Sequence, residues 1–301
     1  MAVVTDSTCD LATALLQQLG IAMVPLMLTV DGTTYRDQVD ISADRYLALL
    51  PEVAEIPKTS APSPGVLAAC YRQALREGAS EVVSIHLSGR LSATLRAAKS
   101  AQGMVGARVE VVDSQSVSLG LGLLVWWAAL SARHGSSAEE VAAEVRSLAS
   151  RLELSFSPVT LDYLARGGRI GGAARWVGSL LDMKPVLTCE QGSIQTFKRI
   201  RGARQIVPAI VQALRLTVPP GSAVLAGVIH AQNEEEASRL EEAMRSTWEV
   251  EDLVVALCGP VLATHGGPGT FGGVVLPLNP DERHRWRQWR QADRGGEVRG
   301  L

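Results

Sequence analysis

Hydroxyl side chains are concentrated in four short segments that we expect where a strand gives way to a helix. These segments are residues 5–10 (TDSTCD), 58–65 (KTSAPSPG), 86–97 (HLSGRLSATLRA) and 111–120 (VVDSQSVSLG). Ser and Thr hydroxyls and the free amides of a helix N-terminus donate hydrogen bonds to an oxyanion, and the helix dipole favours negative charge there. The four segments together therefore predict a carboxylate or phosphate ligand, although any single hydroxyl before a helix is more often a cap.

Candidate cationic partners for such an anion lie in the second half of the chain. Arg201 belongs to the basic segment 197–205 (FKRIRGARQ), and Arg166 and Arg169 flank two glycines in LARGGRIGG. His265 lies in GPVLATHGGPGTFGG, where small neighbours allow a ligand to approach the imidazole. Taken alone, each arginine is more simply a solvated surface residue, and His265 could equally make a structural hydrogen bond.

Apolar periodicity indicates the elements that must position these side chains. Short β-branched runs at residues 2–6, 81–87 and 107–113 lead into helical patterns at 11–20, 92–102 and 116–135. Ser63 before Pro64, and Ser137 with Glu140, mark two further helix starts as an N-cap and a capping box. Alternating strands and helices predict a parallel sheet covered on both faces, whose turns gather at the carboxyl edge of the strands. The hydroxyl-rich segments should therefore converge on one crevice.

The second half of the chain has a different pattern. It predicts a hairpin over residues 184–200 that turns at Gln191 and Gly192, helices at 203–216 and 234–247, and a strand at 222–231. We therefore expect two α/β domains. The N-terminal domain (residues 1–152) should contain a parallel sheet with Rossmann-like layering, and the C-terminal domain (residues 153–280) a mixed sheet.

Residues 281–301 differ from both domains. They contain six arginines and two tryptophans with almost no aliphatic residues. This composition predicts a flexible tail, or one that docks on a surface of the protein. Contact of this tail with membrane headgroups or nucleic acid is a weaker alternative.

The composition narrows the class of protein. With 47% hydrophobic residues, the 301-residue chain can bury two modest cores, and its net charge of −2 does not indicate a nucleic-acid-binding protein. Its four cysteines have no zinc-site or disulfide spacing, so we expect free thiols, no metal and no cofactor.

The N-terminus has no signal-peptide pattern, and polar residues interrupt the uncharged stretch 114–132, so we expect a cytoplasmic protein. The sequence contains no P-loop, HExxH or GxSxG motif, so it does not indicate an enzyme of those classes.

Six ordered blocks resemble a known family. They are VVTDSTCDL, TSAPSPG, LSGRLSATLRAA, VVDSQSVSLGLGLLV, LDYLARGGRIGGAARWVGSLLDMKPVL and GPVLATHGGPGTFGG. In order and spacing they resemble the DegV family of bacterial fatty-acid-binding proteins, from about residue 2 to about residue 278. Because six blocks match, the resemblance is far more specific than any single motif in the chain.

The resemblance implies a two-domain protein that holds one long-chain fatty acid in a buried apolar tunnel, with the carboxyl head between the domains. It also implies a partner fatty acid kinase, which converts the bound acid to an acyl-phosphate for phospholipid synthesis. The chain would then be a lipid-binding subunit and not an enzyme. Carried over by position, the carboxyl-binding hydroxyls are Thr59, Ser60, Ser92 and Thr94, and the phosphate-facing pair is Arg201 and His265.

The chain departs from the family pattern at two positions. Ala93 replaces the usual glycine of a Ser-Gly-Thr motif, and Arg90 stands where a small residue is expected. These departures leave the exact ligand open more than the binding role. An alternative function is a stand-alone phosphotransferase or hydrolase that acts on a small carboxylate or phosphate, with His265 as acid/base and Arg201 as an electrostatic clamp.

Overall fold

The structure, a computed structural model, describes residues 1–53, 55, 57–178 and 183–297. Its N-terminal half is built on a four-stranded sheet in the order β2-β1-β6-β7. These strands are β1 (Ala2–Asp6), β2 (Ile21–Val24), β6 (Glu81–His86) and β7 (Arg108–Asp113), and all pairs are parallel. The parallel sheet predicted from the strand and helix alternation is therefore confirmed.

Helices cover both faces of this sheet, as expected. On one face, α3 (Pro64–Arg76) and α4 (Thr94–Gln102) pack against alternate strand residues such as Val4 and Val82. On the other, α5 (Leu119–Arg133) and α6 (Ala138–Ala149) pack against Val3 and Val83, one residue along each strand. A short helix, α1 (Thr13–Leu19), joins β1 to β2. Ser63 caps α3 and Ser137 forms the capping box of α6, as the sequence predicts.

The C-terminal half contains a six-stranded sheet in the order β10-β9-β8-β13-β11-β12. Its strands are β8 (Glu153–Ser157), β9 (Met183–Glu190), β10 (Ser193–Arg201), β11 (Ala223–His230), β12 (Glu249–Leu257) and β13 (Phe271–Pro277). Only the β11–β12 pair is parallel among the described strand pairs of this sheet, so the mixed sheet is confirmed. The predicted hairpin is β9–β10, and its turn is Gln191–Gly192.

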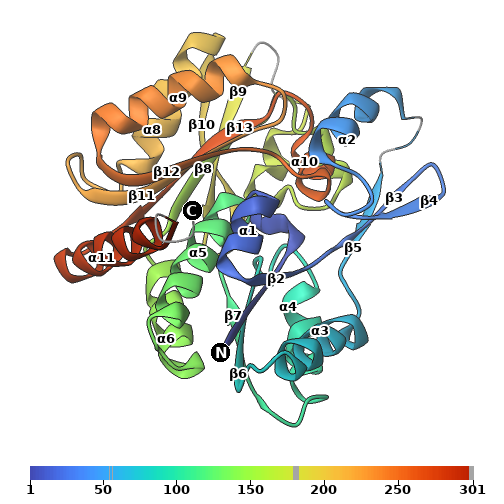
Figure 1. The fold of residues 1–301 in the computed structure, drawn as a ribbon. Helices are drawn as coiled ribbons and strands as arrows, with labels where there is room; N and C mark the ends of the chain where they lie inside the picture. The colour runs from blue at the N-terminus through green and yellow to red at the C-terminus, as the bar shows by residue number, and fades with distance from the viewer. Residues whose placement is uncertain (54, 56, 179–182, 298–301) are drawn as a thin grey trace.

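The six-stranded sheet is enclosed by helices of different origin. Its outer face packs against α8 (Ile206–Leu214) and α9 (Glu234–Thr247), while its inner face packs against α5 (Figure 1). α5 thus lies between the two sheets and is buried from Leu119 to Ser131. Close packing depends on glycine here: a Cβ on Gly122 would lie 2.5 Å from the Cys9 carbonyl oxygen, and a Cβ on Gly227 would lie 2.9 Å from the Leu119 Cβ.

A third, small sheet was not predicted from the sequence. It has the order β4-β3-β5, with β3 (Met27–Val30), β4 (Thr33–Arg36) and β5 (Lys58–Ser60), all antiparallel. The β3–β4 hairpin projects at the right of Figure 1, next to α2 (Ala43–Leu49). Between this sheet and the C-terminal half lies α10 (Pro260–Gly266), which contacts α2, β3 and β5.

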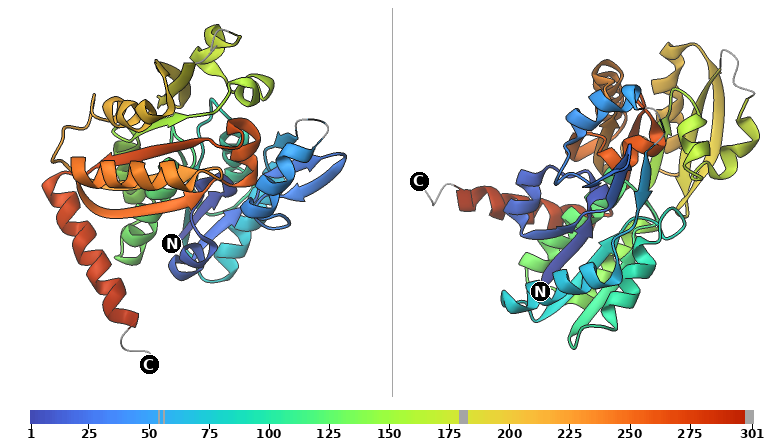
Figure 2. Two further views of the ribbon diagram at one scale, coloured as in Figure 1. Left: turned by 90° about the horizontal axis from the view of Figure 1, so that it is seen from above. Right: turned by 90° about the vertical axis from the view of Figure 1, so that its right-hand side faces the viewer.

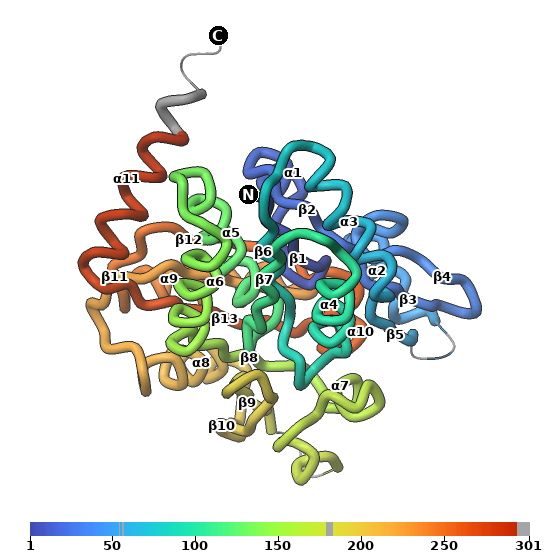
Figure 3. The backbone as a smooth tube through the Cα atoms, turned by 90° about the horizontal axis from the view of Figure 1, so that it is seen from below, coloured from blue at the N-terminus to red at the C-terminus, as the bar shows by residue number. Residues whose placement is uncertain are grey.

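The C-terminal segment forms a helix where the sequence predicts a flexible tail. α11 (Pro280–Glu297) extends along one side of the molecule, beside α5 and α6 (Figures 2 and 3). Its Trp286 is buried, stacks on Trp127 at 5.8 Å and meets Trp126 edge-on at 5.0 Å. This arrangement agrees with the alternative expectation, in which the segment docks on the protein's own surface. None of the described helices is long and apolar enough to cross a membrane.

Ion pairs explain why an arginine-rich segment docks. Glu251 on β12 accepts hydrogen bonds from Arg283 at 2.5 Å and Arg287 at 2.6 Å, and Asp252 accepts from Arg290 at 3.1 Å. Because β12 has a bulge at this point of its ladder with β11, two consecutive acids can both reach α11. Three of the arginines that suggested a membrane or nucleic-acid contact are therefore engaged with the protein itself.

Candidate functional site

A cavity lies between the carboxyl edge of the parallel sheet, the six-stranded sheet and α10. Most of its lining is apolar. The apolar and glycine residues are Leu26, Leu87, Leu91, Val117, Leu154, Phe156, Leu164, Ile194, Ile229, Cys258, Val261, Leu262 and Gly266, and the polar ones are Thr59, Ser92, Ser118, Arg169, His265 and Thr270. A mostly apolar cavity with a few convergent polar groups is the usual form of a small-molecule site.

Thr59 and His265 meet at this cavity although 206 residues separate them. Thr59 comes from β5, which pairs with β3 at Leu28, and His265 comes from the last turn of α10. The Thr59 Oγ1 and the His265 Nε2 are 2.9 Å apart, a hydrogen bond. Ser60 is the next residue of β5, so its side chain points to the opposite face of the strand, where it is exposed. Ser60 does not line the cavity.

The His265 imidazole is neutral at pH 7. Burial is the main cause, and the nearby charge of Arg169 adds to it, so that the pKa of His265 is lowered to about 4. The Nδ1 atom is buried and has no hydrogen-bond partner among the described residues. It lies against the backbone of Gly167, because a Cβ at that position would be only 2.2 Å from Nδ1. Gly167 is therefore necessary for the ring to occupy its position.

Arg169 supplies a positive charge to the cavity. It follows α7 (Asp162–Arg166), and its guanidinium donates from Nε to the Leu91 carbonyl at 3.1 Å and from Nη1 to the Gly167 carbonyl at 2.5 Å. With the carboxylates that the structure describes, Arg169 forms no ion pair. A guanidinium held by two carbonyls and left without a carboxylate can pair with an anionic ligand.

Ser92 and Thr94 lie together at the start of α4, but only Ser92 lines the cavity. Their hydroxyl oxygens are 2.9 Å apart, and the Thr94 amide donates to Ser92 Oγ at 3.2 Å. Thr94 is buried behind Ser92 and can act on a ligand only through it. The side chains of the two departures from the family pattern, Ala93 and Arg90, are exposed and do not line the cavity.

The structure does not bring Arg201 to His265. Arg201 ends β10, pairs with Met183 across the hairpin and is exposed, and it does not line the cavity. The cation beside His265 is Arg169 instead. The stand-alone enzyme considered from the sequence needs His265 and Arg201 at one substrate, and this arrangement does not provide that pair.

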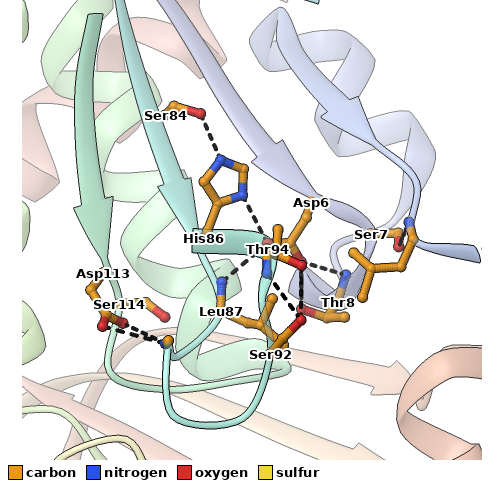
Figure 4. A network of polar contacts seen from close by, with 12 residues as sticks. Asp6, Ser7, Thr8, Ser84, His86, Leu87, Ser92, Thr94, Asp113 and Ser114 are labelled. Carbon is orange, nitrogen blue, oxygen red and sulfur yellow. Dashed lines mark hydrogen bonds and ion pairs between the residues drawn. The ribbon is translucent and has the colours of Figure 1, made fainter. Parts of the chain in front are cut away.

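Most other hydroxyls of the four segments bond to the protein itself (Figure 4). The Thr8 hydroxyl donates to Asp6 at 2.5 Å, and Asp6 also accepts from the Leu87 amide at 3.1 Å. The Ser114 hydroxyl donates to the Ser116 carbonyl at 3.2 Å. The segments thus meet at the carboxyl edge, as expected, and most of their hydroxyls make hydrogen bonds within the protein, although among them only Ser63 caps a described helix through its side chain. Ser118 is an exception, since it lines the cavity and donates to Asp10 at 2.7 Å.

One of these networks has the residue types of a catalytic triad. His86 bonds Asp6 through Nδ1 at 2.9 Å and Ser84 through Nε2 at 2.7 Å (Figure 4). Tyr71 in turn donates to Ser84 at 2.9 Å. Asp6, Ser84 and His86 are completely buried and do not line the cavity, so no substrate reaches them. The network joins β1, β6 and α3 and has a structural role.

Metal ligands are not gathered anywhere in the described part of the chain: it contains no group of three or more His, Cys, Asp or Glu side chains able to hold a metal ion. All four cysteines are free. Burial raises the pKa of Cys258 at the cavity wall well above its ordinary value, so its thiol is neutral at pH 7.

Comparisons with known proteins give a consistent result. The family model described as "Uncharacterised protein, DegV family" matches residues 1–278. A DegV domain-containing protein of Deinococcus radiodurans is 36% identical over 279 residues, which are 93% of this chain and 99% of that protein. Among solved structures, a fatty-acid-binding DegV family protein of Thermus thermophilus is 39% identical with a TM-score of 0.87, covering 92% of this chain and 99% of its own.

A second solved structure carries a named ligand class. It is a fatty-acid (stearic acid) binding protein of Eubacterium ventriosum, which is 27% identical with a TM-score of 0.82 and covers 92% of this chain and 98% of its own. The matched family region ends at residue 278, two residues before α11 begins. The fold and the cavity therefore lie within the shared region, and α11 lies outside it.

Proposed function

This chain belongs to the DegV family, and on that premise we propose that it binds one long-chain fatty acid in its apolar cavity, with the carboxyl group at Thr59, Ser92 and Arg169. The observation that carries the proposal is the composition of the cavity wall, which is apolar except for a few hydrogen-bond donors. The similar proteins of Thermus thermophilus and Eubacterium ventriosum, described as fatty-acid-binding, support it.

The two parts of the ligand match two parts of the cavity. Each buried methylene contributes about 0.8 kcal/mol, so the fourteen methylenes of palmitate would contribute about 11 kcal/mol at full burial. A carboxylate buried without partners would cost several kcal/mol. The Thr59 and Ser92 hydroxyls and the Arg169 guanidinium can offset that cost, because hydrogen bonds and charge pairing favour the ionised form.

His265 contributes to this site through Thr59. Because the imidazole is neutral, it cannot supply a positive charge at pH 7. In the tautomer protonated at Nε2, it donates to Thr59 Oγ1, and the Thr59 hydroxyl is then free to donate to the ligand. Arg169 would carry the charge pairing at the head group.

We further propose that the bound acid is presented to a partner fatty acid kinase for acyl-phosphate formation, with His265 facing the phosphate and Arg201, which lies outside the cavity, on the surface that the kinase would approach. The family resemblance motivates this step, and the exposed position of Arg201 leaves it accessible to a partner. His265→Gln should retain palmitate and form less acyl-phosphate with ATP and a bacterial fatty acid kinase. Acyl-phosphate made by the isolated chain with ATP alone would instead support the stand-alone enzyme.

Adjacent residues of β5 give a matched test of the binding site. Thr59→Val removes the cavity hydroxyl with little change in volume, and Ser60→Ala removes the exposed hydroxyl next to it. Palmitate titration should show about tenfold weaker binding for Thr59→Val and unchanged binding for Ser60→Ala. Equal affinities for the two variants would place the head group elsewhere.

A further inference from the structure

Two buried carboxyl groups from the first forty residues hold the N-terminus of α10. Asp10 Oδ1 accepts a hydrogen bond from the Gly259 amide at 3.1 Å, and Asp37 Oδ1 accepts from the Val261 amide at 3.2 Å. Pro260, between them, has no amide hydrogen to donate. The first two amides of the α10 N-terminus are therefore bound by acids that lie 249 and 224 residues away in the sequence.

The position of α10 matters because this helix carries part of the cavity wall. Val261, Leu262, His265 and Gly266 all line the cavity, and His265 follows Val261 by four residues, on the same face of the helix. A helix of seven residues has little stability of its own, so contacts at its ends determine where it lies. Its middle is held by the Thr264 hydroxyl, 2.6 Å from the Tyr46 hydroxyl.

Asp10 also connects α10 to a second wall of the cavity. Its Oδ2 accepts from the hydroxyl of Ser118, which lines the cavity. Ser118 has φ 58° and ψ −142°, a backbone conformation that costs free energy in a residue other than glycine. The fit at Gly259 is tight as well, because a Cβ there would lie 2.8 Å from Asp10 Oδ1 and 2.7 Å from Gln38 Nε2. These contacts fix α10 against the start of α5.

We propose that Asp10 and Asp37 are positioning residues of the lipid site, which hold α10 by its N-terminal amides and thereby keep His265 against Thr59 at the cavity. This inference rests on the proposed function. Neither carboxyl lines the cavity, so both act on the ligand through α10 and, for Asp10, through Ser118.

The surroundings of the two acids make this arrangement sensitive to pH. Burial raises the pKa of Asp10 to about 8 and that of Asp37 to about 7. The other titratable groups that face them are Asp6 with its partner His86, Cys9, Cys258 and Tyr46. Neither acid forms an ion pair with a cation of the described residues. The hydrogen bonds from the α10 amides lower both pKa values, but burial raises them more, so each acid resists ionisation while it is buried. As the pH rises toward 9, ionisation therefore favours a conformation in which water reaches the two acids, and α10 should be held less firmly.

Variants at the two positions separate the hydrogen bond from the charge. Asp10→Ala and Asp37→Ala remove the acceptor of the α10 amide, whereas Asp10→Asn and Asp37→Asn keep a carbonyl acceptor and cannot ionise. Asp40→Asn, at an exposed acid that pairs with Arg36, is the matched control. The measurements on the full chain are palmitate Kd at pH 6 and pH 9, the melting temperature, and the NMR titration of the His265 imidazole.

We expect each alanine variant to bind palmitate about tenfold more weakly at pH 6. Its His265 pKa should move from about 4 toward the ordinary 6.5 as the ring gains water. At pH 6 the asparagine variants should bind palmitate with wild-type affinity. Between pH 6 and pH 9 their affinity should decline less than that of the wild type, whereas Asp40→Asn should show the full wild-type decline.

Wild-type palmitate binding and His265 titration in both alanine variants would overturn the inference. If those variants do not fold, the asparagine variants decide, and a decline with pH equal to that of the wild type would overturn it. A wild type that binds no palmitate would instead refute the proposed function, while the His265 titration would still test whether the two acids position α10.

Discussion

Gly167 leaves the space that the His265 ring occupies, so replacing this one glycine with alanine should disturb the candidate site. An added Cβ would lie 2.2 Å from His265 Nδ1, 2.9 Å from its Cε1 and 3.1 Å from the Tyr163 carbonyl oxygen. Because unstrained contacts are about 3.5 Å, the ring would have to retreat by about 1 Å, enough to break its 2.9 Å hydrogen bond to Thr59. Gly167 has φ −72°, which alanine adopts freely, so the effect would come from the clash alone.

The magnitude follows from these contacts. Overpacking of this kind costs about 1–3 kcal/mol of unfolding free energy, and the lost hydrogen bond adds about 1 kcal/mol. Urea unfolding should therefore show a clear destabilisation, and palmitate titration about tenfold weaker binding. Gly106→Ala is the matched control, because a Cβ there would meet no atom within 4 Å. If Gly167→Ala matches the Gly106→Ala protein in both measurements, His265 does not depend on Gly167 and the description of the site is wrong.

Three further outcomes are expected. Arg169→Met should weaken palmitate binding by about tenfold or more, whereas Arg201→Met, at an exposed side chain outside the cavity, should leave the affinity unchanged. Weaker binding in Arg201→Met and unchanged binding in Arg169→Met would mean that the carboxyl group pairs with Arg201. Trp286→Ala should lower the urea unfolding free energy by about 3–5 kcal/mol without loss of bound lipid, and a wild-type free energy would mean that α11 contributes little. The pKa of His265 is about 4 in the folded chain and 6.5 in the unfolded chain, so between these pH values the unfolded chain binds more protons. The unfolding free energy should therefore fall as the pH drops from 6.5 to 4, and His265→Gln should reduce this fall by up to about 3 kcal/mol. An unchanged pH dependence in His265→Gln would show that His265 is solvated.

Local patterns were sufficient to predict most of the elements. The helix expected at residues 234–247 coincides with α9, and the strand expected at 222–231 contains β11. The caps at Ser63 and Ser137 depend only on residues three positions away, which is why sequence patterns identify them. The hairpin turn at Gln191 and Gly192 is likewise local, since both residues have positive φ.

The site itself depends on contacts that no local pattern contains. Thr59 reaches His265 only because β5 joins a small sheet with β3, and β5 is just three residues long. Arg169, and not Arg201, lies at the cavity because the turn after α7 packs against the Leu91 carbonyl of the other half of the chain. Both arginines stand in glycine-containing segments, so sequence alone could not separate them.

The C-terminal helix shows the same limit. Composition correctly marked residues 281–301 as unusual, but Arg283, Arg287 and Arg290 are held by acids on β12, and the two tryptophans pack on Trp127 of α5, both distant in sequence. A polar, arginine-rich segment is expected to be flexible only when the rest of the protein offers it no complementary surface. Here Glu251 and Asp252 provide that surface.

The most direct test of the account is native mass spectrometry of the full chain as purified from a bacterial host, followed by denaturation to release any ligand. We predict one bound species per chain, with the mass of a long-chain fatty acid, and its loss or marked reduction in Arg169→Met. A chain that carries no ligand and takes up neither palmitate nor oleate when they are added would contradict the central claim.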